Sequence, residues 1–274
     1  LAFNRDAADE LGQRVRDRLS GIEGIEGVTA QTFHGFGQSV IAEATGKKPT
    51  LAPWLEHSGQ DLAFMAEIAG AIASHDPQFR RDWDLFRTVY ARDLGPIGEA
   101  ADPEASDGRR RGFRTADGKL VKSKEEQLIC NWLFFNGVNY VYEPAYEHET
   151  ADRRYRQYRP DFFYSDIGLY HEHFALDEEG RAPEHFGDGY VEGVNWKRAL
   201  HAEKGTELFE TTSAQIRSNE ALDRLREMLV GRGVELSFDP ARKTDGPPPL
   251  TDEQLARTLR VFQQHVKSNG LSKL

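Results

Sequence analysis

Apolar residues recur at intervals of three and four along much of the chain, which predicts amphipathic helices. Between residues 5 and 19, Ala8, Leu11, Val15 and Leu19 share one helical face, and glycines then interrupt the pattern. The same reasoning predicts further helices over 34–44, over 60–94 in pieces, and over 123–136, 191–204, 219–229 and 251–267. We therefore expect helices that pack through one face against a core.

Short runs rich in aromatic and β-branched residues alternate with these helices and predict strands. They lie at 28–33, 140–146, 158–164, 169–174, 207–212 and 234–238. From residue 123 onward the order is α-β-β-β-α-β-α-β, which predicts a compact α/β unit with helices packed against a sheet. Residues 95–118 are rich in Gly, Pro, Asp and Arg and are interpreted as a linker.

Composition sets broad limits on function. With 274 residues, two domains are the prior expectation, and a net charge of −10 does not indicate a general nucleic-acid coat. A single cysteine, Cys130, excludes an intrachain disulfide and favours a reducing, cytoplasmic compartment. No apolar run is long enough to span a membrane, so no membrane partner is expected. Basic clusters lie at 109–114, 119–124 and 153–159.

The first fifty residues carry two motifs at a characteristic spacing. Leu-Ala-Phe-Asn-Arg-Asp-Ala-Ala-Asp-Glu-Leu opens the chain, and Thr-Phe-His follows at 32–34. Together they resemble two motifs of UvrD/Rep-type DNA helicases that lie along the single-stranded DNA path of the first motor domain. The resemblance implies that DNA contacts come from Phe3, Asn4, Thr32, Phe33 and His34. Aromatic rings stack on any base, and hydroxyl and imidazole groups can hydrogen-bond to phosphates.

The alternative is that Phe3 and Phe33 belong to a core and that His34 caps a helix. The sequence has no Gly-x-x-x-x-Gly-Lys-[Ser/Thr] loop and no acidic Walker B strand, so these residues alone are not expected to hydrolyse ATP. The resemblance implies a piece of a longer protein. ATP would bind only to the full-length motor, and the remainder of that motor would be a partner of this piece.

Two carboxylates stand in consecutive aromatic runs. Asp161 follows Tyr-Arg-Pro and opens the run at 161–164, and Glu172 lies in the middle of the run at 169–174. Carboxylates on neighbouring strands can hold one hard divalent cation. Lys197 follows on a predicted helix, and an ammonium group nearby can stabilise the charge that develops when a phosphodiester is attacked.

This layout resembles the PD-(D/E)XK nuclease fold. Asp161, with proline before it, matches the first acidic residue of that motif, and Glu172 matches the second. Phe174 stands where the lysine is expected, and the resemblance implies that Lys197 on the adjoining helix replaces it. It also implies that Glu126 is an accessory acidic residue.

The resemblance further implies a mechanism of metal-assisted hydrolysis. Asp161 and Glu172 would hold Mg²⁺ or Mn²⁺, and the ion would polarise a phosphate and activate a water molecule. Lys197 would orient that water or stabilise the oxyanion, and Arg159 would belong to the arginines that contact DNA.

Each candidate also has a purely structural interpretation. Glu126 could complete a capping box with Ser123, and Asp161 could pair with Arg159 on a strand edge. Lys197 could be a surface lysine. Glu210 could be a further site carboxylate or an exposed strand position, and the histidines at 148, 171, 173 and 201 match no familiar zinc spacing.

The span 115–213 as a whole resembles the insert in a group of bacterial UvrD-like helicases. We therefore expect a restriction-endonuclease-like mixed sheet flanked by helices, attached to a partial motor domain by a helical linker. The expected boundaries are 1–50 for the motor segment, 51–114 for the helical region and linker, 115–240 for the nuclease-like domain and 241–274 for the return to the helicase. The function expected is that of a helicase with an inserted DNA nuclease, and the alternative is a catalytically silent DNA-binding module.

Overall fold

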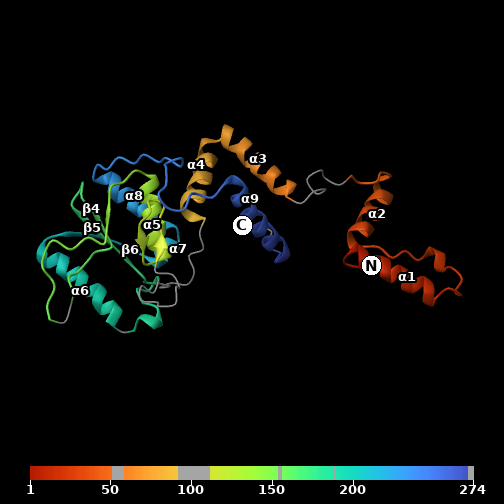
Figure 1. Cartoon of the computed structure of the whole chain (residues 1–274), viewed down its shortest axis with the longest axis horizontal. Coiled ribbons are helices and arrows are strands. Elements are labelled where there is room, and N and C mark those ends of the chain that lie inside the picture. Colours follow the sequence, from red (N-terminus) through yellow and green to blue (C-terminus); the bar gives the residue numbers. More distant parts are fainter. Residues whose placement is uncertain (51–58, 92–111, 154–155, 188, 271–274) are drawn as a thin grey trace. The chain divides into compact units, whose positions relative to one another are not determined.

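The computed structural model describes residues 1–50, 59–91, 112–153, 156–187 and 189–270 (Figure 1). It is a mixed α/β protein that divides into two compact units, 1–64 and 65–274. The boundary between the units falls inside one helix, α3 (Gln60–His75). The basic residues 109–111 and 154 lie outside the described residues.

The first unit contains two helices whose N-termini are capped by polar side chains. Asn4 accepts a hydrogen bond from the backbone of α1 (Arg5–Arg18), and Thr32 does the same for α2 (Phe33–Thr45), so each satisfies an N–H group that has no partner within the helix. A 3₁₀ turn, Ile25–Gly27, lies between the two helices. Both helices begin within one residue of the predicted positions.

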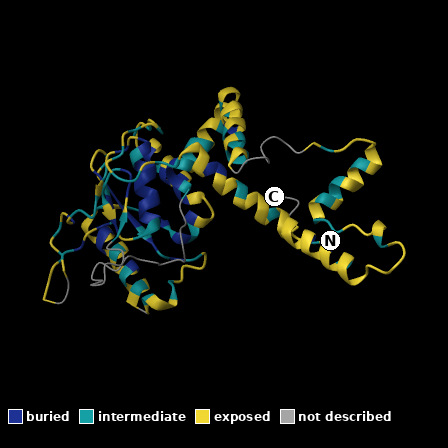
Figure 2. Cartoon of the chain, turned by 45° about the vertical axis from the view of Figure 1, so that its right-hand side comes forward, coloured by how far each residue is buried: buried dark blue, intermediate teal, exposed yellow. Residues whose placement is uncertain are grey.

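The strand predicted over 28–33 is reduced to one isolated parallel bridge. Ala2 donates its N–H to Gln31 and accepts from Phe33, which pairs Ala2 with Thr32. Among the described residues, the segment 28–33 pairs only with Ala2. One paired residue is too few to form a regular strand. Figure 2 shows that most residues of α1 and α2 are exposed.

The second unit opens with helices and a small hairpin. The predicted helical pieces are α3, α4 (Pro77–Leu85) and a single π turn, Phe86–Tyr90. The prediction of a linker over 95–118 is wrong where the chain is described, because β1 (Phe113–Arg114) and β2 (Leu120–Val121) pair as antiparallel strands. The Gly and Asp residues that suggested a linker form the turn, in which Gly118 has a φ of 82°.

The remaining elements follow the predicted order closely. They are α5 (Lys124–Phe135), β3 (Val141–Tyr142), β4 (Phe162–Tyr164), β5 (Leu169–Phe174), a 3₁₀ turn (Glu184–Phe186), α6 (Gly189–Lys204), β6 (Glu207–Thr212), α7 (Ser213–Arg217), α8 (Glu220–Gly231) and α9 (Asp252–Ser268). Thr251 and Gln254 form a capping box at the start of α9. None of the helices in the described part of the chain combines the length and the apolarity needed to cross a membrane.

Two predictions in this region are wrong. Residues 234–238 do not form a strand, because Ser237 and Asp239 donate their N–H groups to the last carbonyls of α5 and so satisfy the end of that helix. The short helix α7 was not predicted. It follows β6 directly, and a capping box between Thr212 and Gln215 starts it.

A four-stranded sheet in the order β3-β4-β5-β6 forms the centre of the second unit. The pairs β3–β4 and β4–β5 are antiparallel, and β5–β6 is parallel, with α6 as the crossover between those two strands. Alternation of side chains along the strands gives the sheet two buried faces.

The two faces are covered by different helices. On one face, α5 and α8 pack against Phe162, Tyr164 and Leu169, and Cys130 is buried in this core. On the other face, α6 packs through Leu200 against Tyr170, and through Val194 against Phe174. In Figure 1 these helices accordingly lie on opposite sides of β4, β5 and β6. The strand β5 is therefore buried on both faces.

The core on the α5 and α8 face should dominate the stability of the second unit. Leu225→Ala removes a fully buried side chain and is expected to lower the free energy of unfolding by about 2–5 kcal/mol, because a cavity remains. Val230→Ala, on an exposed position of the same helix, should change it by less than about 0.5 kcal/mol. Urea unfolding of the whole chain measures both, and equal effects would contradict this assignment of the core.

Candidate active site

Antiparallel pairing of β4 with β5 places the two predicted carboxylates opposite each other. Phe162 pairs with His171, so the next position outward on each strand brings Asp161 opposite Glu172. Pro160 has no N–H group, and the regular ladder of β4 begins only at Phe162. Asp161 and Glu172, which are eleven residues apart in the sequence, are therefore direct neighbours across the two strands.

Glu172 is the most deeply buried member of the group, with none of its surface exposed. Both of its carboxylate oxygens have a partner: the Tyr158 hydroxyl donates to Oε1 over 2.6 Å, and the Lys197 ammonium donates to Oε2 over 2.5 Å. A buried carboxylate is costly unless it is hydrogen-bonded or paired, and these two donors offset that cost. Tyr158 was not predicted as a site residue, and only its place in the Tyr-Arg-Pro-Asp run could have indicated it.

Lys197 reaches the site because of its position on α6. The buried residues Val194, Leu200 and His201 mark the face of this helix that packs on the sheet, and Lys197 lies between them. Its ammonium group also lies 5.4 Å from the centre of the Phe174 ring. Phe174, which stands at the position expected for the motif lysine, thus contacts Lys197, the residue expected to replace that lysine.

Asp161 is half-buried and is held by the backbone. Its Oδ2 accepts the N–H of His173 over 2.8 Å, and its own carbonyl accepts the N–H of Glu143. No ion pair with Arg159 is recorded in the described part of the chain, and Arg159 is exposed. The carboxylate of Asp161 is close enough to Glu126 and Glu172 to raise the pKa of both.

Glu126 lies in the first turn of α5 and is also close to Asp161. Its N–H donates to the Ser123 hydroxyl, which caps α5, and that hydroxyl donates in turn to Oε1 over 2.9 Å. Its Oε2 accepts from the Tyr142 hydroxyl and from the N–H of Lys122. Burial and the negative charge of Asp161 raise the pKa of Glu126 to about 7. Ser123 caps the helix, but its backbone N–H does not donate to the Glu126 side chain, so the capping box is incomplete; the role of Glu126 as an accessory acidic residue stays a prediction.

If all three carboxyl groups, Glu126, Asp161 and Glu172, were ionised, they would carry more negative charge than the one ammonium group of Lys197 neutralises. Burial, and then Asp161, raise the pKa of Glu172 to about 8, although Lys197 and Tyr158 act in the opposite direction. Burial alone would lower the pKa of Lys197, but Glu172 and Asp161 outweigh it and raise that pKa. A cation beside the carboxylates would relieve this repulsion.

The donor atoms suit a hard cation but do not form a complete cage. Within the described ranges, no group of three or more His, Cys, Asp or Glu side chains is arranged to hold a metal ion. Asp161 and Glu172 supply carboxylate oxygens from adjacent strands. Magnesium is commonly held by one or two carboxylates together with water and substrate phosphate, so two carboxylates fit this ion.

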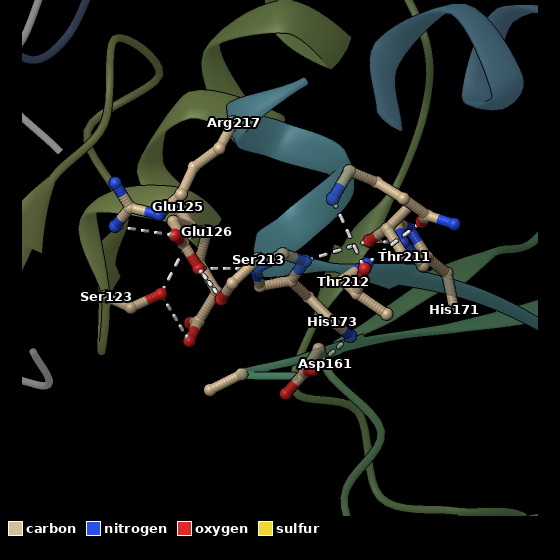
Figure 3. A network of polar contacts seen from close by, with 12 residues as sticks. Ser123, Glu125, Glu126, Asp161, His171, His173, Thr211, Thr212, Ser213 and Arg217 are labelled. Atoms are coloured by element: carbon tan, nitrogen blue, oxygen red, sulfur yellow. Dashed lines mark hydrogen bonds and ion pairs between the residues drawn. The ribbon is translucent and has the colours of Figure 1, made fainter. Parts of the chain in front are cut away.

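A second polar network lies on the other face of β5 and was not predicted (Figure 3). His173 contacts Thr211 through Nδ1 at 2.9 Å and Glu125 through Nε2 at 2.9 Å, and Ser213 donates to the same oxygen of Glu125. Burial would raise the pKa of Glu125, but its bond to His173 and its neighbours keep the pKa below the usual value. This network fixes the strand residue whose N–H holds Asp161.

The other acidic and histidine candidates have structural partners. Arg198 donates to Glu210 over 2.6 Å, so Glu210 forms an ion pair beside the cluster. His171 contacts Tyr164 and Thr211 through its two ring nitrogens. His201 contacts Tyr158 and Thr206 in the same way.

The predicted DNA-contacting residues of the first unit are exposed rather than buried. Phe3 is 92 % exposed and Phe33 is 59 % exposed, so neither belongs to a core formed by the described residues. His34 is exposed at the start of α2, and the capping role suggested for it belongs to Thr32. Asn4 caps α1, so Asn4 and Thr32 are helix-capping residues at the positions where the resemblance expects DNA contacts.

Comparison of the chain with protein-family models, with curated proteins and with solved structures found no match.

The raised pKa of Glu172 predicts a distinctive dependence of stability on pH. A carboxyl group whose pKa is higher in the folded chain than its ordinary value of 4.5 stabilises the fold below that value, and the stabilisation is lost as the pH rises through about 8. Between about pH 5 and pH 9, the unfolding free energy of the wild type should therefore fall relative to Glu172→Gln by more than about 1 kcal/mol.

Urea unfolding in buffer that contains EDTA measures this difference. Glu207→Gln is the matched control, because its ion pair with Arg232 lies on the surface at the other end of β6. The difference in unfolding free energy between Glu207→Gln and the wild type should stay constant over the same pH range. A wild type that becomes more stable relative to Glu172→Gln as the pH rises would show that the Lys197 ion pair outweighs burial.

Proposed function

We propose that residues 115–240 form a metal-dependent DNA nuclease domain and that the chain is part of a UvrD/Rep-type DNA helicase. The observation that carries the nuclease proposal is the convergence of Asp161, Glu172 and Lys197 in one cluster, from β4, β5 and α6. Two carboxylates can hold a divalent ion that activates water, and an ammonium group can stabilise the charge that develops when a phosphodiester is attacked.

Each residue has a role that follows from its surroundings. Asp161 and Glu172 would hold Mg²⁺ or Mn²⁺, which supplies polarisation of the phosphate and a lowered pKa of bound water. Lys197 donates to Glu172 and keeps its charge, so it can instead donate to a water molecule or to the phosphate oxygen that gains negative charge. Tyr158 holds Glu172 from the opposite side, and Glu126 adds a carboxyl group whose pKa of about 7 suits exchange of a proton with water.

The first unit supports the helicase part of the proposal through its exposed aromatic residues. Ala2 and Thr32 pair as parallel neighbours, so Phe3 and Phe33 follow adjacent strand-like segments at the same end. Two exposed aromatic rings at one edge suit stacking on the bases of single-stranded DNA. The apolar residues Val40 and Ile41 of α2 are also exposed, and we propose that the remainder of the helicase motor covers them.

A second candidate function is a catalytically silent module that binds DNA and guides the helicase. The observation in its favour is that Lys197 already forms an ion pair with Glu172, while Phe174 occupies the usual lysine position. In this candidate the pair stabilises the fold and does not act on a substrate.

Cleavage of plasmid and single-stranded DNA with Mg²⁺ or Mn²⁺ separates the two candidates. Asp161→Asn and Glu172→Gln should abolish cleavage above background, because each removes a negative charge that holds the ion. Lys197→Met should lower the rate by about 10²-fold, the typical effect of removing one group that stabilises the transition state. Glu207→Gln, on the surface of β6, should leave the rate unchanged.

Equal residual cleavage in the wild type and all three site variants would refute the nuclease proposal. Absence of cleavage together with salt-dependent DNA binding by the wild type would support the silent module.

Single-stranded DNA binding tests the role of the first unit. Phe3→Ala and Phe33→Ala should each weaken binding of an oligonucleotide by about 1–3 kcal/mol, because each removes one stacking surface. Ile22→Ala, which truncates an exposed apolar side chain of the same unit, is the control and should have no effect. Fluorescence anisotropy at low salt measures the affinities, and unchanged binding in both phenylalanine variants would contradict the assignment.

A further inference from the structure

A cavity lies beside the carboxylate cluster, along the first half of α6. Its volume is 590 Å³, within the range of roughly 300–1,000 Å³ that is typical of small-molecule sites. Its lining residues are Arg156, Tyr158, Gly189, Glu192, Gly193 and Trp196. All of them belong to the second unit.

Three of these residues form one open face of α6. Gly189, Gly193 and Trp196 are spaced by four and three residues, so they share a helical face. A Cβ atom added at either glycine would meet no other atom within 4 Å, so the space above the backbone is free. On this face of α6, no side chain covers the backbone at Gly189 and Gly193, and the indole ring of Trp196 follows.

The indole ring is exposed and packs against one aromatic neighbour. Trp196 is 48 % exposed, and its ring packs edge-on against Tyr158, with the centroids 5.6 Å apart and the planes at 80°. Edge-to-face contact is a favourable arrangement of two aromatic rings. The exposed surface of the indole can consequently stack on a second planar group.

Tyr158 connects the cavity to the proposed catalytic cluster. Its ring borders the cavity, and its hydroxyl donates to Glu172 over 2.6 Å. Lys197 follows Trp196 in the sequence and binds the other oxygen of the same carboxylate. A molecule in the cavity would therefore lie one side chain away from the cluster.

We propose that this cavity receives one unpaired nucleobase of single-stranded DNA, which stacks on Trp196 while the adjoining phosphate lies at Asp161 and Glu172. The charges favour a base over a phosphate inside the cavity, because Glu192 repels phosphate but accepts hydrogen bonds from base amino groups. Arg156, which also lines the cavity and is exposed, suits contact with the DNA backbone. The bases of a duplex are already stacked and paired, so the cavity selects single strands. This inference rests on the proposed nuclease function for its substrate.

The test compares binding of an intact oligonucleotide with that of an abasic strand of equal length, in EDTA so that no cleavage occurs. The background is Phe3→Ala/Phe33→Ala, which removes base stacking by the first unit. The preference for the intact strand should fall about tenfold in Trp196→Ala, since stacking on one aromatic residue is worth about 1–3 kcal/mol. Trp196→Phe, which retains a ring, should keep most of the preference.

A second variant fills the cavity and leaves the indole in place. Gly193→Leu adds a side chain where the backbone is open, and it should lower the preference as much as Trp196→Ala. Val191→Ala, at an exposed position of α6 that does not line the cavity, is the matched control and should retain the preference of the Phe3→Ala/Phe33→Ala background. If Trp196→Ala loses its helical circular dichroism, Trp196→Phe and Gly193→Leu decide the question.

An undiminished preference in Gly193→Leu and in folded Trp196→Ala would overturn the proposal. Its failure is distinguishable from failure of the nuclease function. DNA cleavage by the wild type with an undiminished preference in the variants would remove the base site alone. If the variants lose the preference and the wild type cleaves no DNA, the base site is supported and the nuclease function is refuted.

Discussion

The pairing of β4 with β5 is the constraint on which the candidate site depends. It sets Asp161 opposite Glu172 and, through the N–H of His173, fixes the orientation of the first carboxylate. A shift of this register by one residue would turn the side chains of one strand to the opposite face and separate the two acids. The network of His173, Glu125 and Ser213 ties β5 to α5 and α7, so the register is held from outside the sheet as well as within it.

The ion pair between Lys197 and Glu172 can stabilise the fold, but it also affects how the cluster could bind a cation. The pair places an ammonium group at the cluster without a lysine on the strand itself, but it also occupies one of the two oxygens with which Glu172 could bind a cation. Because burial and Asp161 keep the pKa of Glu172 high, the carboxylate is costly to ionise, and binding of a cation would shift the balance toward the charged form. In the proposed nuclease, this balance decides whether the carboxylate of Glu172 is free to bind a metal ion.

Local patterns predicted the elements well where a single segment determines its own structure. The helices that begin at Arg5 and Asp252 and the strands at 169–174 and 207–212 follow from periodicity, capping and aromatic content. Predictions failed where the outcome depends on a distant partner. The apolar run at 234–238 satisfies the end of α5 rather than a strand, and the run at 28–33 finds only Ala2.

The proximity of the four candidate residues could be predicted from the sequence only in part, because they come from four different elements. Asp161, Glu172, Lys197 and Glu126 were named from spacing and resemblance, and the structure brings them together. Tyr158 and the Glu125–His173 contact were missed, because nothing local distinguishes a tyrosine or histidine that supports a carboxylate from one that fills a core.

The position of Cys130 has a practical consequence. It is the only cysteine of the chain, it is fully buried, and burial raises the pKa of its thiol far above the usual range. The reactive thiolate is therefore scarce and shielded from solvent. A cysteine introduced on the surface of either unit can carry a maleimide dye or spin label with little background from the native thiol, so labelled pairs can report how far apart the two units lie in solution.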